Sequence, residues 1–227
     1  MSVQLTNLKV IVSENLYLSD PESSKLGKKI IFYSVEMIDG IGFEKFTFKK
    51  LGLLIDSPEA SIYRYFRNKN QLLTYLISWY WGWMEYRLVI ETTNILSPEK
   101  RLEKSINLIT SSINEILNLE GVSIKKLQRI IVSESAKSYL TKDVDRANKE
   151  GAYLNFKQFV LRISTIILEV NPKYKYPQML LTTIIEGAHL QVFFAEHLPR
   201  LTNKQKSSDY ITTFYTNLAL QSIKSTK

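Results

Sequence analysis

The stretch FTFKKLGLLIDSPEASIYRYFRNKNQLLTYL, residues 46–76, predicts two short helices joined by a tight turn. Thr47 is a good N-cap for a helix over residues 47–54, and Asp56 marks the turn that follows it. Ser57-Pro58-Glu59 then opens the second helix, because serine caps helices, proline suits the first helical position and glutamate favours the positive end of the helix dipole.

Helices are also predicted on both sides of this pair. One covers residues 24–39 and is stopped by Gly40-Ile41-Gly42, and the other starts after the cap Asn68 and covers residues 69–95. Three consecutive short helices with a tight turn before the last one indicate a helix-turn-helix motif. The apolar residues placed to pack its two helices together are Phe48, Leu51, Ile55 and Ile62.

That packing leaves the start of the second helix, from about residue 57, free to enter the major groove of double-stranded DNA. Its exposed side chains are expected to be small or polar, and helix N-termini on either side favour phosphate. The candidate DNA contacts are Thr47, Lys49, Ser57, Glu59, Ala60, Ser61, Tyr63, Arg64, Tyr65, Arg67 and Lys69. The alternative is that Tyr63, Tyr65 and Phe66 are only core aromatics of a helical bundle.

Working outward, sparse glycine and proline divide the rest of the chain into further helices over residues 97–120, 123–139, 144–170, 177–198 and 207–223. We therefore predict an all-α protein of about nine helices. The expected domains are an N-terminal arm (1–22), the helix-turn-helix domain (23–70) and a C-terminal helical bundle (71–227). The arm is expected to be short and extended with a turn near Glu14-Asn15. It is either frayed or a small strand or hairpin that packs on the domain or on a partner subunit.

Composition narrows the possible functions. The net charge of +8 favours an anionic partner, although much of the excess lies at residues 125–175 and is not specific to the helix-turn-helix. The absence of cysteine excludes disulfides, thiolate metal sites and cysteine nucleophiles. Residues 1–20 do not have the pattern of a signal peptide, and the apolar run at 72–84 is too short to span a bilayer. We expect a cytoplasmic protein with no membrane partner.

The stretch Ser61-Ile-Tyr-Arg-Tyr-Phe-Arg-Asn-Lys-Asn-Gln-Leu-Leu73 resembles the signature of the TetR family of bacterial repressors. Ile38-Asp-Gly-Ile-Gly-Phe43, Phe46-Thr47 and Leu51-Gly52 also fit, so the resemblance covers about residues 28–76. It implies that Thr47, Tyr63 and Lys69 bind DNA phosphates, while residues 57–64 face the base edges. It also implies a dimer on a near-palindromic operator and release by a small effector.

Two features depart from that family. Asp56-Ser57-Pro58 stands where the family usually has glycine, an apolar residue and serine or threonine, and Gly52 replaces a common alanine. Asp56 tolerates a left-handed conformation better than most residues. Glu59 is unusual near DNA but can accept a hydrogen bond from a cytosine amino group.

The C-terminal bundle carries the remaining predictions. An aromatic stripe in residues 75–86 indicates either interdomain packing or one wall of a pocket for an apolar or aromatic ligand. The candidate pocket residues are Trp79, Trp83, Tyr86, Phe156, Phe159, His189 and Phe193. In the resembled family two C-terminal helices of each subunit form a four-helix dimer interface, and the candidates here are Ile184, Ile185, Ala188, Val192, Ala195, Ile211, Phe214, Tyr215 and Leu218.

Two other classes of protein compete with a repressor. One is a helical module that binds a small molecule or lipid but has lost DNA binding, which the altered turn would explain. The other is a ferritin-like metalloprotein, suggested by Glu186-x-x-His189, although such sites need a second pair on facing helices. No catalytic grouping or phosphate-binding loop is present, so we expect no enzyme activity, no cofactor and no metal.

Overall fold

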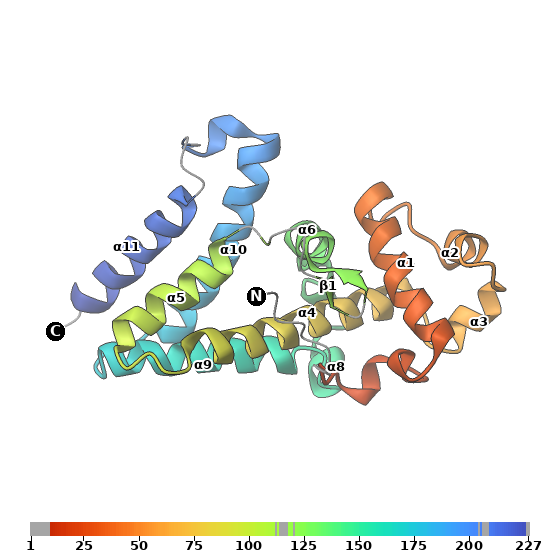
Figure 1. Ribbon diagram of the computed structural model, residues 1–227, viewed down its shortest axis with the longest axis horizontal. Helices are drawn as coiled ribbons and strands as arrows, with labels where there is room; N and C mark the ends of the chain where they lie inside the picture. Colours follow the sequence, from red (N-terminus) through yellow and green to blue (C-terminus); the bar gives the residue numbers. More distant parts are fainter. Residues whose placement is uncertain are drawn as a thin grey trace. The chain divides into compact units, whose positions relative to one another are not determined.

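The computed structural model describes residues 10–111, 113, 118, 119, 121–203, 205 and 209–225. Over these residues the chain is mainly helical, which confirms the all-α class (Figure 1). The α-helices are α1 (Lys25–Ile41), α2 (Phe48–Leu54), α3 (Glu59–Tyr63), α4 (Lys69–Thr92), α5 (Pro98–Thr110), α6 (Ile124–Glu134), α7 (Ala136–Tyr139), α8 (Val144–Lys149), α9 (Leu154–Val170), α10 (Pro177–His197) and α11 (Tyr210–Ser225). Between α5 and α6, β1 (Asn118–Leu119) and β2 (Val122–Ser123) pair antiparallel.

Two expected helices are interrupted, so the described residues form eleven α-helices rather than about nine. The helix expected over 123–139 breaks at Ser135 into α6 and α7. The helix expected over 144–170 breaks into α8 and α9 around Gly151, whose φ of 83° lies in the left-handed region that favours glycine. The helix expected over 97–120 ends earlier, at Thr110, and residues 112, 114–117 and 120 lie outside the described residues.

The chain divides into two compact units, which are described separately here. Unit 1 comprises Met1–Trp83 and Ile113–Asn155, and unit 2 comprises Met84–Ser112 and Phe156–Lys227. These units differ from the expected domains 1–22, 23–70 and 71–227, because α6 packs against α1 although the two helices are far apart in sequence. Unit 1 therefore contains the arm, the helix-turn-helix and α6 to α8.

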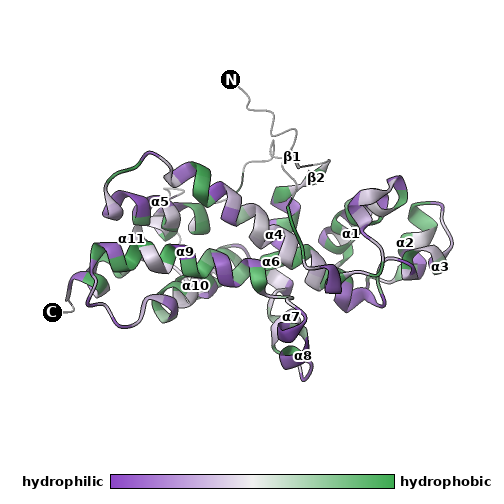
Figure 2. Ribbon diagram, turned by 90° about the horizontal axis from the view of Figure 1, so that it is seen from below, coloured by the Kyte–Doolittle hydropathy of each residue, from purple (hydrophilic) through white to green (hydrophobic). Residues whose placement is uncertain are grey.

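Serine and glycine cap the two ends of α1, of which the stop at Gly42 was predicted from sequence. The Ser24 hydroxyl accepts a hydrogen bond from the Gly27 amide at 2.9 Å and begins α1, and Gly42, with φ 78°, ends it. One face of α1 is apolar and buried while the rest is polar, as its colouring shows (Figure 2). Residues of unit 1 with no exposed surface include Ile30, Val35, Phe46, Leu51, Ile62, Phe66 and Leu72.

Ion pairs join α6 and α7 to α1 and the loop after it. The Arg129 guanidinium donates two hydrogen bonds to the Asp39 carboxylate, of 2.7 Å from Nε to Oδ1 and 2.5 Å from Nη2 to Oδ2. Lys126 pairs with Glu36, and Lys137 pairs with Glu44 at 2.6 Å. The bidentate Arg129–Asp39 contact is the most directional of them, because a guanidinium fork matches the carboxylate geometry.

The described part of the arm packs on unit 1 without forming a strand. Val10, Val12 and Leu16 are buried, and Glu14–Leu16 and Pro21–Ser23 are 3₁₀ helices. The Ser13 hydroxyl donates to the Glu150 carbonyl at 2.8 Å, and the Leu18 amide donates to the Tyr65 carbonyl at 2.7 Å. The arm is thus neither frayed nor a hairpin over these residues, and residues 1–9 lie outside the described chain.

Unit 2 is built from α5, α10 and α11 together with parts of α4 and α9. Its interior is almost purely aliphatic, as expected for a helical core. Residues with no exposed surface include Leu88, Ile106, Phe159, Ile163, Ile167, Leu181, Ile185, Ala219 and Ile223. Gly187 lets α10 approach α11 closely, because a side chain there would collide with the Tyr215 hydroxyl.

Candidate nucleic-acid interface

The turn between α2 and α3 is built by backbone hydrogen bonds. The Thr47 hydroxyl accepts from the Lys50 amide at 3.2 Å, which begins α2 as predicted. At the other end, the Ile55 amide donates to Leu51 at 3.0 Å and the Ser57 amide donates to Gly52 at 2.9 Å. Asp56 between them has φ 52°, so it adopts the left-handed conformation expected for this position.

The two departures from the TetR pattern are coupled in space. A β-carbon on residue 52 would lie 2.7 Å from the carbonyl oxygen of Ser57, which is backbone and cannot rotate away. The turn made by Asp56, Ser57 and Pro58 therefore needs glycine at position 52. Together they preserve the helix-turn-helix instead of abolishing it.

The third helix begins one residue later than predicted. Pro58, with φ −56° and ψ 140°, occupies the N-cap of α3, and no side chain caps it. The prediction that Ser57 caps this helix is wrong, because the Ser57 backbone closes the preceding turn. Ile62 is buried against α2, whereas Ala60, Tyr63 and Arg64 are exposed and Glu59 and Ser61 are half-buried.

Several of the predicted DNA contacts lie on the surface around α2 and α3. Thr47, Lys49, Arg64 and Arg67 are exposed. Tyr63 is 46% exposed, and its ring stands edge-on to the ring of Phe48 at a centroid distance of 5.1 Å. That contact orients the phenol while its hydroxyl remains accessible to a DNA backbone.

Two of the residues predicted to contact DNA make hydrogen bonds within unit 1. The Tyr65 hydroxyl is 2.7 Å from the Ser24 hydroxyl at the start of α1. The Lys69 ammonium donates to the carbonyl oxygens of Phe43 at 3.0 Å and Glu44 at 3.2 Å, and lies 4.7 Å from the centre of the Phe43 ring. Both side chains fix the helices of the motif relative to one another.

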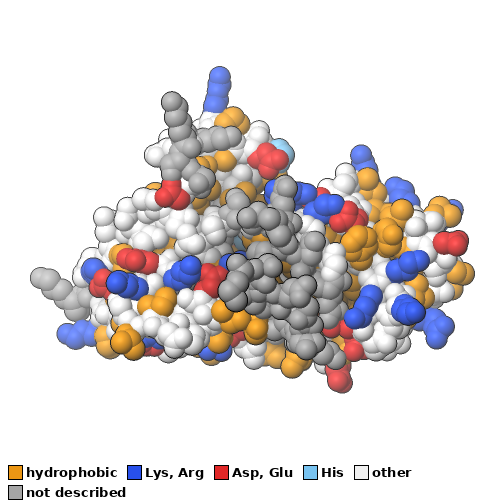
Figure 3. Space-filling view, viewed as in Figure 1, with side chains coloured by type: hydrophobic (Ala, Val, Ile, Leu, Met, Phe, Trp, Pro, Cys, Tyr) orange, Lys and Arg blue, Asp and Glu red, His pale blue; other side chains and the backbone are white. Residues whose placement is uncertain are grey.

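Sequence reasoning omitted two exposed lysines from the candidate contacts. Lys45 and Lys50 lie beside Thr47, and the Lys50 ammonium donates to the Lys45 carbonyl at 2.9 Å. Their place at the N-terminus of α2 was the signal that could have identified them. Lys and Arg side chains stand out over this part of unit 1 (Figure 3), and Glu44 is already paired with Lys137.

The structure distributes the predicted ligand-pocket residues over both units. Trp79 and Trp83 are buried in the core of unit 1, where the Trp79 indole donates to the Glu22 carboxylate at 2.9 Å. The others belong to unit 2, where Phe159 and His189 are buried, Tyr86 and Phe156 are half-buried and Phe193 is 37% exposed. Burial lowers the pKa of His189 to about 4, so its imidazole is neutral at pH 7.

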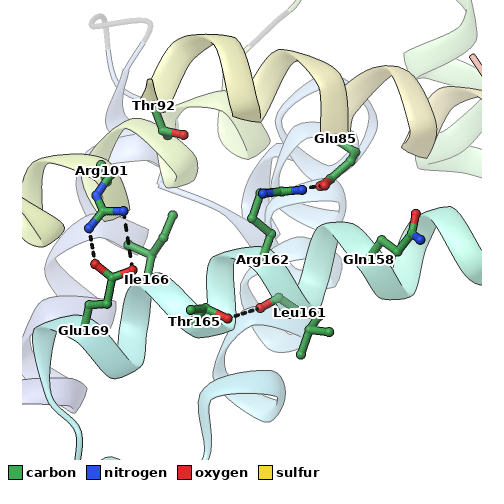
Figure 4. A pocket seen from close by; sticks show the side chains of 9 residues that line it. All are labelled: Glu85, Thr92, Arg101, Gln158, Leu161, Arg162, Thr165, Ile166 and Glu169. Carbon is green, nitrogen blue, oxygen red and sulfur yellow. Dashed lines mark hydrogen bonds and ion pairs between the residues drawn. The ribbon is translucent and has the colours of Figure 1, made fainter. Parts of the chain in front are cut away.

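A cavity of about 480 Å³ opens in unit 2 among α4, α5 and α9 (Figure 4). Ion pairs dominate its walls: Arg101 pairs with Glu169, and the Arg162 Nε donates to Glu85 at 2.5 Å. A smaller apolar hollow of about 320 Å³ is lined by Phe156, Val160 and Leu161 together with polar neighbours. Of the predicted pocket residues, only Phe156 lines either space.

The predicted dimer residues separate into two groups. Ile184, Ile185, Ala188, Ile211 and Tyr215 are buried within the chain itself. This is a correction to the expected interface, because α10 and α11 use these side chains to pack on each other and on α5. Val192 and Ala195 are half-buried, while Phe214 is 59% and Leu218 is 39% exposed.

Across the described residues, no group of three or more His, Asp or Glu side chains is arranged to hold a metal ion. The single Glu186–His189 pair therefore finds no partner cluster for a ferritin-like site in that part of the chain. The same residues include no helix with the length and apolarity needed to cross a membrane.

Comparison with solved structures places the fold. The chain is similar to AibR bound to isovaleryl coenzyme A and operator DNA, with a TM-score of 0.59 and 15% identity over 84% of this chain and 97% of AibR. It is also similar to apo AibR, with a TM-score of 0.51 and 14% identity over 84% and 96% of the two chains. AibR has the all-α TetR fold, so the fold implied by the sequence resemblance is confirmed. No protein-family model and no curated protein matches the sequence.

Proposed function

We propose that this chain, which has the TetR-type fold, is a transcriptional regulator that binds double-stranded DNA as a dimer and responds to a small ligand. The observation that carries the proposal is the intact helix-turn-helix. Its turn differs from the family pattern at Asp56, Ser57 and Pro58, yet the outer face of α3 remains exposed. The similarity to AibR, solved with operator DNA, supports it. The exposed cations around α2 and α3, which include Lys49, Arg64 and Arg67, suit a polyanionic partner.

DNA binding can be tested by fluorescence anisotropy with a labelled duplex from the region upstream of the gene. We expect the Tyr63→Ala, Arg64→Ala double variant to lose about tenfold or more in affinity, since each phosphate or base contact is worth about 1–3 kcal/mol. Arg200→Ala is the matched control, because Arg200 is an exposed arginine of unit 2. Equal and weak binding by the wild type and both variants would contradict the proposal and favour the ligand-binding module.

The dimer would form through the exposed apolar side chains of α10 and α11. Leu190 is 51% exposed and Phe193 37% on α10, and Phe214 and Leu218 are one turn apart on α11. Burying such a surface against its symmetric copy is the usual way in which soluble chains cover it.

Light scattering coupled to size-exclusion chromatography tests this interface. Phe214→Glu combined with Leu218→Glu should convert a dimer into a monomer. Leu96→Glu is the control, because Leu96 is 94% exposed but lies outside α10 and α11. A wild-type monomer, or a dimer that the double variant leaves intact, would exclude this surface.

The ligand bound to AibR suggests the first effectors to test. AibR was solved with isovaleryl coenzyme A, so this compound and free coenzyme A are the first to titrate against the DNA complex. The ion pairs that line the 480 Å³ cavity of unit 2 favour a polar effector over the apolar or aromatic one expected from sequence. Release of DNA by isovaleryl coenzyme A but not by coenzyme A would identify the acyl chain as the recognised part.

A further inference from the structure

A separate cavity, here called the arm pocket, lies in unit 1 and has a volume of about 310 Å³. Four segments line it: the arm, the start of α4, α7 and α8. Its polar lining includes Asn15, Arg67, Gln71, Lys137, Thr141 and Arg146. The volume lies at the small end of the range for ligand sites, roughly 300–1,000 Å³.

Hydrogen bonds of the arm hold one wall of this pocket. The side-chain amide of Asn15 donates to the Glu150 backbone carbonyl at 3.1 Å, and the side-chain amide of Gln71 donates to the Asn15 backbone carbonyl at 3.3 Å. The opposite wall belongs to α7 and α8, and α8 is a hydrophilic helix without a buried residue (Figure 2). The pocket is thus held by defined contacts on the arm side.

The cations of the pocket differ in how far they are already neutralised. Lys137 is held by Glu44 at 2.6 Å and Glu134 at 2.9 Å. Among the described residues Arg146 pairs only with Asp143, at 3.3 Å, and this pair is mostly exposed and therefore weak. Within the described chain, the Arg67 guanidinium makes no ion pair or hydrogen bond, since its one polar contact is a backbone amide donating to Gln71.

We propose that the arm pocket binds a small hydroxylated oxyanion, a phosphate ester or carboxylate of a polyol. Arg67 and Arg146 supply charge for the oxyanion, because guanidinium groups bind phosphate and carboxylate with paired hydrogen bonds. The carboxamides of Asn15 and Gln71 and the carboxylates of Asp143 and Glu150, which also line the pocket, match hydroxyl groups of the same ligand.

Ligand binding in the arm pocket should affect DNA binding through Arg67, and this step rests on the proposed function. The same guanidinium is a candidate phosphate contact at the end of the helix-turn-helix. An oxyanion in the arm pocket would draw Arg67 away from DNA, so ligand and DNA would compete for one side chain. By linkage, each would weaken the other by the same factor.

Ligand binding is measured first, without DNA, by calorimetric titration with glucose 6-phosphate, gluconate, glucose and inorganic phosphate. We expect glucose 6-phosphate or gluconate to bind more tightly than inorganic phosphate, and glucose not to bind. Arg67→Gln and Arg146→Gln should each lower the affinity about tenfold, the value of one charge-assisted hydrogen bond. Arg200→Gln, at an exposed arginine outside the pocket, should leave it unchanged.

The competition is then measured by anisotropy with the upstream duplex at constant ionic strength. Wild type and Arg200→Gln should bind DNA more weakly in the better-binding oxyanion than in chloride, while Arg146→Gln should show a smaller difference. Absence of binding by all four probes, or equal binding by wild type and both pocket variants (an adventitious ion only), would overturn the site. A site confirmed by calorimetry in a protein that binds no DNA would overturn the competition and the proposed function but retain the pocket.

Discussion

Replacing Gly52 by alanine tests the geometry of the turn directly. In an exposed helix this change normally stabilises by about 1 kcal/mol, because alanine is the better helix former. Here the new β-carbon would lie 2.7 Å from the Ser57 carbonyl oxygen, closer than real contacts allow. Forcing extra atoms into a packed site costs about 1–3 kcal/mol. We therefore expect Gly52→Ala to lower the free energy of unfolding by about 1–2 kcal/mol.

Gly40→Ala is the matched control, with the opposite expected sign. Gly40 is an exposed position near the end of α1, and a β-carbon there would meet nothing within 4 Å. Urea unfolding followed by circular dichroism measures both variants, and Gly40→Ala should gain up to about 1 kcal/mol. If Gly52→Ala is as stable as Gly40→Ala, the close approach of the turn to α2 does not exist and the explanation of both departures from the TetR pattern fails.

Three other substitutions test separate features. Asp56→Ala should lose about 1 kcal/mol in urea unfolding, because alanine at φ 52° carries the left-handed penalty that aspartate partly avoids. Asp39→Asn should lose about 1 kcal/mol or less, since Arg129 is half exposed and solvent screens the pair. His189→Gln should flatten the dependence of stability on pH between about 6.5 and 4, measured by thermal unfolding. The unfolded state takes up a proton at His189 in this range and the folded state does not, so wild-type stability falls as the pH falls, by up to about 3 kcal/mol.

Each of these has an outcome that would contradict it. Asp56→Gly should be tolerated better than Asp56→Ala, and the reverse order would mean that the conformation of this residue is not the cause. Asp39→Asn should lose its effect in an Arg129→Gln background, because a pair broken once cannot be broken again. A wild-type profile that is flat from pH 6.5 to 4, or a His197→Gln variant that flattens it equally, would exclude burial of His189 as the source.

Local sequence patterns predicted the helix-turn-helix well, because its signals lie in adjacent residues. Thr47 caps α2, Asp56 is left-handed, and the residues expected to pack α2 on α3 are buried. The same kind of signal predicted the ends of α4 and α10 to within a few residues. Gly151 was also a signal for a helix break, but the helical periodicity of the residues on both sides favoured one continuous helix over residues 144–170.

Roles that depend on distant partners were not predictable in this way. Lys69 and Tyr65 read as DNA contacts from their positions, yet their partners are carbonyls 23 to 26 residues away and a serine 41 residues away. The apolar stripe on α10 could not show which of its sides the chain itself covers. Trp79 and Trp83 similarly gave no sign that unit 1 would enclose them.

The hydrogen bonds of the arm also set an order of events during synthesis. The Ser13 hydroxyl binds a carbonyl 137 residues further along, and the Ile11 carbonyl accepts from Asn155, 144 residues away. Chains begin to fold from the N-terminus as they emerge from the ribosome. These two hydrogen bonds can therefore form only after the chain has been made as far as residues 150 and 155. Until then only its contacts with earlier residues, such as the Leu18–Tyr65 hydrogen bond, hold the arm in place, so the nascent chain is most prone to aggregation just before unit 1 closes.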